Sequence, residues 1–160
     1  MTNEQAFQDA FSENHCWGCG PLNPYGLQVK SYWSGDSDEA VCTWQPQPYH
    51  TAGPQHILNG GIIAVLMDCH CVGTAVAAAY RAEGRAMTSQ PRLYYATASL
   101  QVTYLRPTPI AEPVVLRARV TNMMEKKTLL ACSLFSGGEE CAHGEVVAVR
   151  VSPLWYAAPA

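Results

Sequence analysis

Residues 59–80 read NGGIIAVLMDCHCVGTAVAAAY, and no other segment of the 160-residue chain constrains the architecture as strongly. The run is rich in Ala, Val, Leu and Met, which favours a helix, and Asn59 is a good N-cap residue. Gly84, just beyond it, suits a helix end. Asp68 and His70 interrupt the apolar run, and an aspartate costs about 2.5–3.5 kcal/mol at a bilayer centre. We predict one long helix, buried in protein rather than in a membrane.

Strand patterns lie on both sides of this helix. Before it we predict strands at 27–33 and 40–44, joined by a turn at Gly35-Asp36. After it, alternating apolar residues predict four more strands, near 100–104, 114–121, 128–135 and 145–152. Short connections favour antiparallel pairing, and a single apolar helix can bury itself only against the sheet. The predicted fold class is α+β, a long central helix wrapped by a curved antiparallel sheet.

Length and composition limit the domain organisation and the partners. We expect one domain over 1–160, with an N-terminal helix (2–11) and a cysteine loop within 1–26 and the core at 27–152. Only 14% of residues are charged against 48% hydrophobic, so part of the surface is expected to be covered by another subunit. A net charge of -3 argues against a nucleic-acid partner. The N-terminus lacks the apolar core of a signal peptide, and seven cysteines fit a reducing cytoplasm.

Asp68 is the most informative single residue. Three and four positions away on the helix lie Ala64, Val65, Cys71 and Val72, so no local basic partner explains the carboxylate. Burial of a lone carboxylate raises its pKa, which is typical of functional sites. The alternatives are a distant arginine or backbone partner, or exposure to water.

Gly60 and Gly61 open the helix. Glycine is poor there for helix stability, but it leaves first-turn amides open to a ligand, where they and the helix dipole can stabilise an oxyanion. The alternative is close packing against a strand. Asp68 lies roughly 12 Å further along the axis at about 1.5 Å per residue, so a second subunit is expected to complete the site.

Two motifs carry a resemblance to a known family. His56-Ile57-Leu58-Asn59-Gly60-Gly61-Ile62 with Met67-Asp68-Cys69, and then 98–107 (ASLQVTYLRP), resemble the hotdog-fold thioesterase superfamily, in the branch of the phenylacetate-pathway thioesterase. The resemblance covers about residues 15–152 and implies a hotdog fold, edge-to-edge dimers that often form homotetramers, and an acyl-CoA substrate.

The same resemblance assigns roles to residues. Asp68 matches the catalytic general base or nucleophile, and Gly60 and Gly61 match the glycines that hold the thioester oxygen. Thr97 falls where a water-positioning hydroxyl is expected, with Thr88 a weaker candidate. Asn59 replaces the usual histidine before the glycines, so His56 is expected to take over part of that substrate-binding role.

The cysteines raise two other interpretations, a metal site and a Cys-His nucleophile. Cys16-x-x-Cys19 lacks a second C-x-x-C, and Cys69 with Cys71 or a histidine can join it only through the fold, so we predict no metal and no cofactor. Cys69 and His70 are adjacent on the helix and point about 100° apart, which disfavours a Cys-His nucleophile.

The predicted function is hydrolysis of an acyl-CoA to a free acid and CoA. Arg92 and Arg106 are candidates for the CoA phosphates by location. The alternatives are a non-catalytic acyl-CoA-binding hotdog protein, kept open by Asn59, and a less favoured enoyl-CoA hydratase, whose usual Asp–His spacing is absent around Asp68.

Overall fold

The computed structural model describes residues 5–159, and its elements follow the predicted order of two strands, one long helix and four strands. A short 3-10 helix comes first and a short helix comes last. The elements are η1 (Phe7–Ala10), β1 (Tyr32–Trp33), β2 (Glu39–Trp44), α1 (Gly60–Ala82), β3 (Tyr94–Tyr104), β4 (Val114–Met123), β5 (Lys127–Ser136), β6 (Glu139–Val151) and α2 (Pro153–Tyr156).

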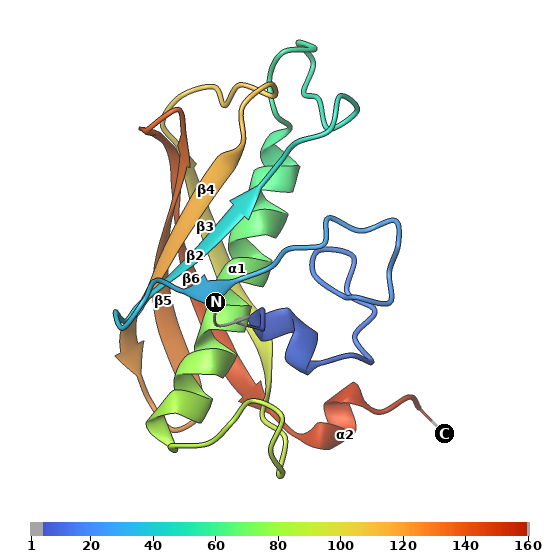
Figure 1. The fold of residues 1–160 in the computed structure, drawn as a ribbon, viewed down its shortest axis with the longest axis vertical. Helices are drawn as coiled ribbons and strands as arrows, with labels where there is room; N and C mark the ends of the chain where they lie inside the picture. The colour runs from blue at the N-terminus through green and yellow to red at the C-terminus, as the bar shows by residue number, and fades with distance from the viewer. Residues whose placement is uncertain (1–4, 160) are drawn as a thin grey trace.

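The strands form one antiparallel sheet in the order β1-β2-β4-β5-β6-β3. Figure 1 shows α1 running along one face of this curved sheet. Residues 145–152 carry apolar side chains on both faces, as an inner strand does, and β6 lies between β5 and β3. Gly137 and Gly138 form the β5–β6 turn with φ values of 57° and 81°, a conformation that glycine adopts readily.

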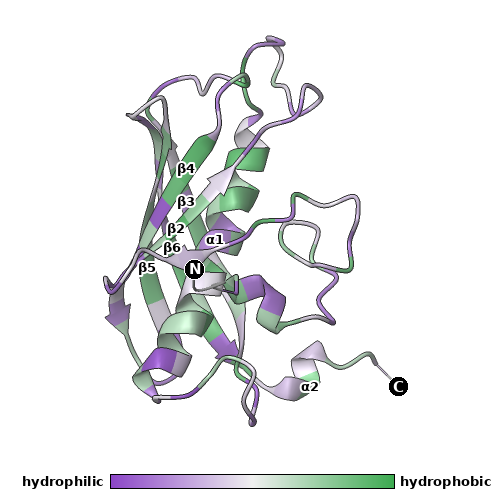
Figure 2. Ribbon diagram, in the orientation of Figure 1, coloured by the Kyte–Doolittle hydropathy of each residue, from purple (hydrophilic) through white to green (hydrophobic). Residues whose placement is uncertain are grey.

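Helix α1 is held by a cap at its start and by burial along its length. The Asn59 side chain accepts hydrogen bonds from the amides of Gly61 and Ile62. Leu66, Met67, Cys71 and Tyr80 are fully buried against the sheet, and Figure 2 shows the apolar helix facing apolar strands. By length and composition α1 could cross a membrane, but 61% of its most apolar window is buried inside the structure. That burial is what a core helix shows.

The predicted strand over 27–33 is largely wrong, because this segment bonds to the cysteine loop instead of to the sheet. The Leu27 amide donates to the Trp17 carbonyl at 2.9 Å, and the Val29 amide donates to the Gly18 carbonyl at 3.0 Å. Only Tyr32–Trp33 pairs with β2. The N-terminal helix expected over 2–11 is reduced to η1, and its residues 2–4 lie outside the described residues.

Candidate active site

Asp68 lies in the middle of α1, half-buried, and faces β3. The Thr97 hydroxyl of β3 donates a hydrogen bond to its Oδ1 at 2.5 Å. No arginine or lysine pairs with this carboxylate within residues 5–159. Burial raises the pKa of Asp68, and the Thr97 hydrogen bond opposes that effect by favouring the ionised form. The result is an accessible carboxylate whose affinity for a proton is raised.

A β-bulge in β3 places Thr97 on the helix side of the sheet. Thr97 pairs with Ala148, and Ser99 pairs with the adjacent Val147, so one extra residue is inserted between them. Thr97 and Tyr104 are seven positions apart and would face opposite sides of a regular strand. The inserted residue reverses the alternation, so both side chains contact α1.

A cavity of about 350 Å³ opens beside the carboxylate. Its walls come from α1, β3, η1, the cysteine loop and α2, and they are mostly apolar and aromatic. Phe11, Val76, Tyr94 and Tyr156 are among the lining side chains, together with Asp68 and Thr97. An apolar cavity with a few polar groups at one point is the usual form of a small-molecule site.

The start of α1 differs from the prediction in one respect. We expected the first-turn amides to be open, but Asn59 Oδ1 accepts from the Gly61 amide at 2.8 Å and from the Ile62 amide at 3.3 Å. The Gly60 amide has no hydrogen-bond partner among the described residues. Because the cap occupies two donors, Gly60 is the remaining candidate donor to a bound oxygen.

Tyr104 is a neighbour of the helix start that the sequence did not single out. Its hydroxyl donates to the Gly60 carbonyl at 2.6 Å, and its ring lies 3.3 Å from the position that a Cβ on Gly60 would occupy. In the sequence, Tyr104 was only an aromatic residue at the end of a predicted strand. Its contact with Gly60 could not be predicted, because that contact depends on the β-bulge in β3.

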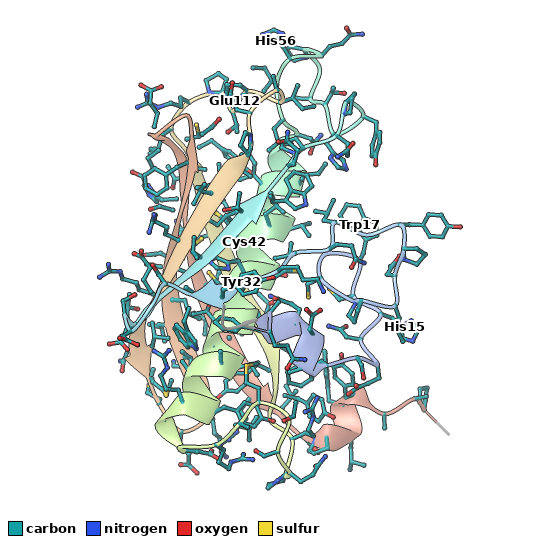
Figure 3. The ribbon with its side chains drawn as sticks, viewed as in Figure 1. His15, Trp17, Tyr32, Cys42, His56 and Glu112 are labelled. Carbon is teal, nitrogen blue, oxygen red and sulfur yellow. The ribbon has the colours of Figure 1, made fainter. Side chains whose placement is uncertain are left out.

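The remaining predicted residues lie apart from Asp68. Figure 3 shows His56 on the loop beyond the start of α1, well away from His15 and Trp17, which mark the cysteine loop. Thr88 is exposed between α1 and β3 and does not line the cavity.

The two arginines proposed for CoA phosphates have other partners. Arg92 donates to the carbonyls of Met87 and Ala10 and lies over the Phe11 ring, so its guanidinium is used inside the fold. Arg106 is half-exposed and pairs with Glu139 at 3.1 Å. Arg106 is therefore the better placed of the two for an anionic ligand.

His70 and Cys69 point in different directions, as predicted. Burial lowers the pKa of His70 to about 4. Its neutral ring lies between the Ser31 hydroxyl, 2.8 Å from Nδ1, and the Ala40 carbonyl, 3.2 Å from Nε2. Cys69 faces the cysteine loop instead. The pair does not form a nucleophile and base.

The fold and this site together define a class. One long helix inside an antiparallel sheet, with an unpaired carboxylate on an apolar cavity, is the arrangement expected of a hotdog-fold hydrolase. The model of the thioesterase superfamily matches residues 55–143. A thioesterase superfamily protein from Shewanella loihica is 34% identical, and the match covers 91% of this chain and 99% of that one with a TM-score of 0.67. The chain therefore belongs to the thioesterase superfamily.

Two further proteins are similar to this chain. The acyl-coenzyme A thioesterase THEM4 of Bos taurus is 24% identical over 129 residues, 79% of this chain and 46% of the bovine protein. The chain thus spans about half the length of that relative. The Escherichia coli PaaI protein from the phenylacetic acid degradation operon is 15% identical with a TM-score of 0.63, covering 79% of this chain and 81% of that one, and it shares the fold. The predicted hotdog fold and the predicted membership of the thioesterase superfamily are confirmed.

Proposed function

We propose that this protein hydrolyses an acyl-CoA to a free acid and CoA, with Asp68 as the catalytic carboxylate. The observation that carries the proposal is the Asp68–Thr97 hydrogen bond at the edge of an apolar cavity. The family supports the reaction class, and the bovine relative's name supports the CoA ester. The acyl group enters the cavity, where Val76 and the rings of Phe11 and Tyr94 bury it.

Two chemical roles are compatible with Asp68. As a general base, the carboxylate takes a proton from water while the water oxygen attacks the thioester carbon. As a nucleophile, it attacks that carbon itself, and water then hydrolyses the resulting anhydride. In both cases the carbon–sulfur bond breaks and CoA leaves as its thiolate. Thr97 holds one carboxylate oxygen and thereby directs the other toward the substrate.

The second half of the site comes from a partner subunit. β3 is an edge strand of eleven residues with β6 on one side and no strand on the other within residues 5–159. Its Leu100 is 37% exposed. An exposed, partly apolar edge favours pairing with another strand, and two-fold symmetry makes that pairing antiparallel.

A specific register completes the site. If Thr97 lies opposite the partner's Tyr104, the two-fold axis passes between Leu100 and Gln101. Tyr104 contacts Gly60 in its own chain, so this register brings the partner's Gly60 amide toward Asp68. Within one chain, Thr97 and Tyr104 are about 23 Å apart at roughly 3.3 Å per residue. The Gly60 amide then stabilises the negative charge on the thioester oxygen.

We extend the same proposal to assembly and location. Two such dimers form a homotetramer, the state that the resemblance implies. The protein works in the cytoplasm, where its seven free cysteines stay reduced.

The test is a panel of short-chain, medium-chain, long-chain and aryl acyl-CoAs assayed by release of free thiol. We expect turnover of at least one class by the parent and a large loss in Asp68→Asn. Binding of CoA esters with no thiol release across the panel would favour the non-catalytic alternative. Loss of enoyl-CoA absorbance without thiol release would favour the hydratase. Among residues 5–159 no histidine lines the cavity beside Asp68, and the His70 ring lies between Ser31 and Ala40.

A further inference from the structure

Three thiols from distant parts of the chain meet beside the cavity. Cys16 and Cys19 come from the loop before β1, and Cys69 comes from α1. Their sulfurs all lie within 4.8 Å of one another, and the Cys16 and Cys69 sulfurs are 3.8 Å apart. The sequence alone offered only one C-x-x-C pair. The fold supplies the third sulfur from the residue next to Asp68.

The loop is shaped to bring its sulfurs onto the helix. Gly18 packs so closely that a Cβ there would lie 2.2 Å from Cys69 Sγ. A Cβ on Gly20 would lie 2.3 Å from the Cys16 nitrogen, and the Gly20 amide closes a tight turn by donating to the Cys16 carbonyl at 2.7 Å. Both glycines are therefore required by the close approach. The Leu27 and Val29 amides then fix the loop from the other side.

The three sulfurs lie where the loop meets the helix. Cys16 is exposed, Cys19 is half-buried and Cys69 is buried. The Asn14 side-chain amide donates a hydrogen bond to Cys19 Sγ at 3.8 Å, so the cluster also has a polar neighbour. A metal binds the thiolate form of cysteine, and a polar donor beside a sulfur favours that form.

The spacing fits a zinc ion. With Zn–S bonds of about 2.3 Å and tetrahedral angles, two sulfurs on one ion are about 3.8 Å apart. The Cys16–Cys69 separation equals that value, and no pair exceeds it by more than about 1 Å. We propose that Cys16, Cys19 and Cys69 bind one Zn²⁺ per chain as thiolates, with the fourth coordination position facing the cavity that Asp68 borders.

The open position follows from the surroundings. All three cysteines line the same cavity as Asp68 and Thr97, and the described residues place no fourth Cys, His, Asp or Glu ligand atom within the cluster. Zinc sites with three protein ligands leave one position for water or another small ligand. Each thiol that is protonated loses its proton when its sulfur binds the ion, so affinity rises with pH.

The test uses the full chain, reduced and stripped of metal with a chelator, and titrated with Co²⁺ as a spectroscopic probe. We expect one ion per chain, sulfur-to-cobalt charge-transfer absorption in the near ultraviolet, strong visible bands, and their loss when Zn²⁺ is added. Cys16→Ser, Cys19→Ser and Cys69→Ser should each weaken binding by more than the roughly 10–100-fold that loss of an outer-sphere partner costs.

Cys42→Ala is the matched control, because Cys42 lies in β2, outside the cluster. Figure 3 shows it on the sheet, apart from the loop that carries Trp17. The control should keep the parental spectrum. Cys16 is exposed, so Cys16→Ser should fold. Zinc should raise the melting temperature of the parent, and Cys16→Ser should differ only in lacking that increase. A parental spectrum in Cys16→Ser, or thiol oxidation to a disulfide without any charge-transfer band, would overturn the proposal.

Discussion

The start and the middle of helix α1 offer a contrast within one element. At the start, Asn59 is exposed and uses its side chain to cap two amides, leaving Gly60 with a donor that has no partner among residues 5–159. In the middle, Asp68 is half-buried, bonded to Thr97, and bordered by a cavity. One region can stabilise negative charge and the other can activate a nucleophile, yet they lie roughly 12 Å apart along the helix. This separation is the basis of the proposal that each chain carries two half-sites and that a second chain joins them.

Removing the carboxylate should have the largest effect. Asp68→Asn should lower kcat for thiol release by roughly 10²–10⁴-fold, the range for loss of a general base. Asp36→Asn, in the exposed turn before β2, is the matched control and should keep parental kcat.

The same variant tests burial of the carboxylate through stability. A raised pKa in the folded chain means that the contribution of Asp68 to stability is greatest below the unfolded pKa and falls as pH rises through the folded pKa. At neutral pH the uncharged amide that replaces the carboxylate in Asp68→Asn avoids that loss. The melting temperature of this variant should equal or exceed the parent's, and a clear decrease would mean that Asp68 is a structural residue.

Removing the amide at the helix start should have the next largest effect. Gly60→Pro deletes the free donor and adds a ring beside Tyr104. The backbone can accept it, because proline is favoured at the first helical position and Asn59 already has the extended ψ of 130° that precedes proline. We expect a loss of roughly 10²–10³-fold in kcat, as for other oxyanion donors. Gly60→Ala adds a Cβ beside Tyr104 but keeps the amide, so equal loss in both variants would point to crowding instead.

Loss of the Thr97 hydroxyl should lower kcat less than loss of the Asp68 carboxylate or of the Gly60 amide. Thr97→Val keeps the shape but removes the hydrogen bond, and a bond to a charged group is worth about 1.5–3 kcal/mol, or roughly 10–100-fold in rate. Thr97→Ser should retain most activity. If valine and serine behave alike, the hydroxyl does not position the carboxylate.

The pH profile should show the smallest and most specific change. Burial raises the pKa of Asp68, so the acid limb of kcat/KM should lie above the range of an ordinary aspartate. Thr97→Val should move that limb to higher pH, since the lost hydrogen bond favours the ionised form. If the acid limb of Thr97→Val stays at the parental pH in matched buffers, Asp68 is not the group whose titration controls the rate.

Much of the helix half of the molecule could be predicted from sequence. The apolar run fixed the length of α1, Asn59 marked its first turn, and Asp68 stood out because no helical neighbour pairs with it. The edge position of β3 and its bulge at Ala98 could not be predicted, because both depend on which strand lies opposite. Thr97 was placed through the family resemblance alone.

The cysteine loop was less predictable than the helix. Leu27 and Val29 alternate with polar residues as a strand does, but their amides bond to carbonyls of residues 17 and 18. Cys69 joins Cys16 only because the loop folds back onto α1, a contact between residues 53 positions apart. Long-range contacts of this kind leave no local periodic pattern.

Mixing two inactive variants gives the most direct measurement of whether a site is shared between chains. Asp68→Asn and Gly60→Pro chains are unfolded together, refolded together and assayed for thiol release. Random pairing makes half of the dimers mixed, and each mixed dimer has one site with both native residues, so about a quarter of parental activity should return. If the mixture stays as inactive as its components while forming mixed dimers, Asp68 and Gly60 do not act across the subunit boundary.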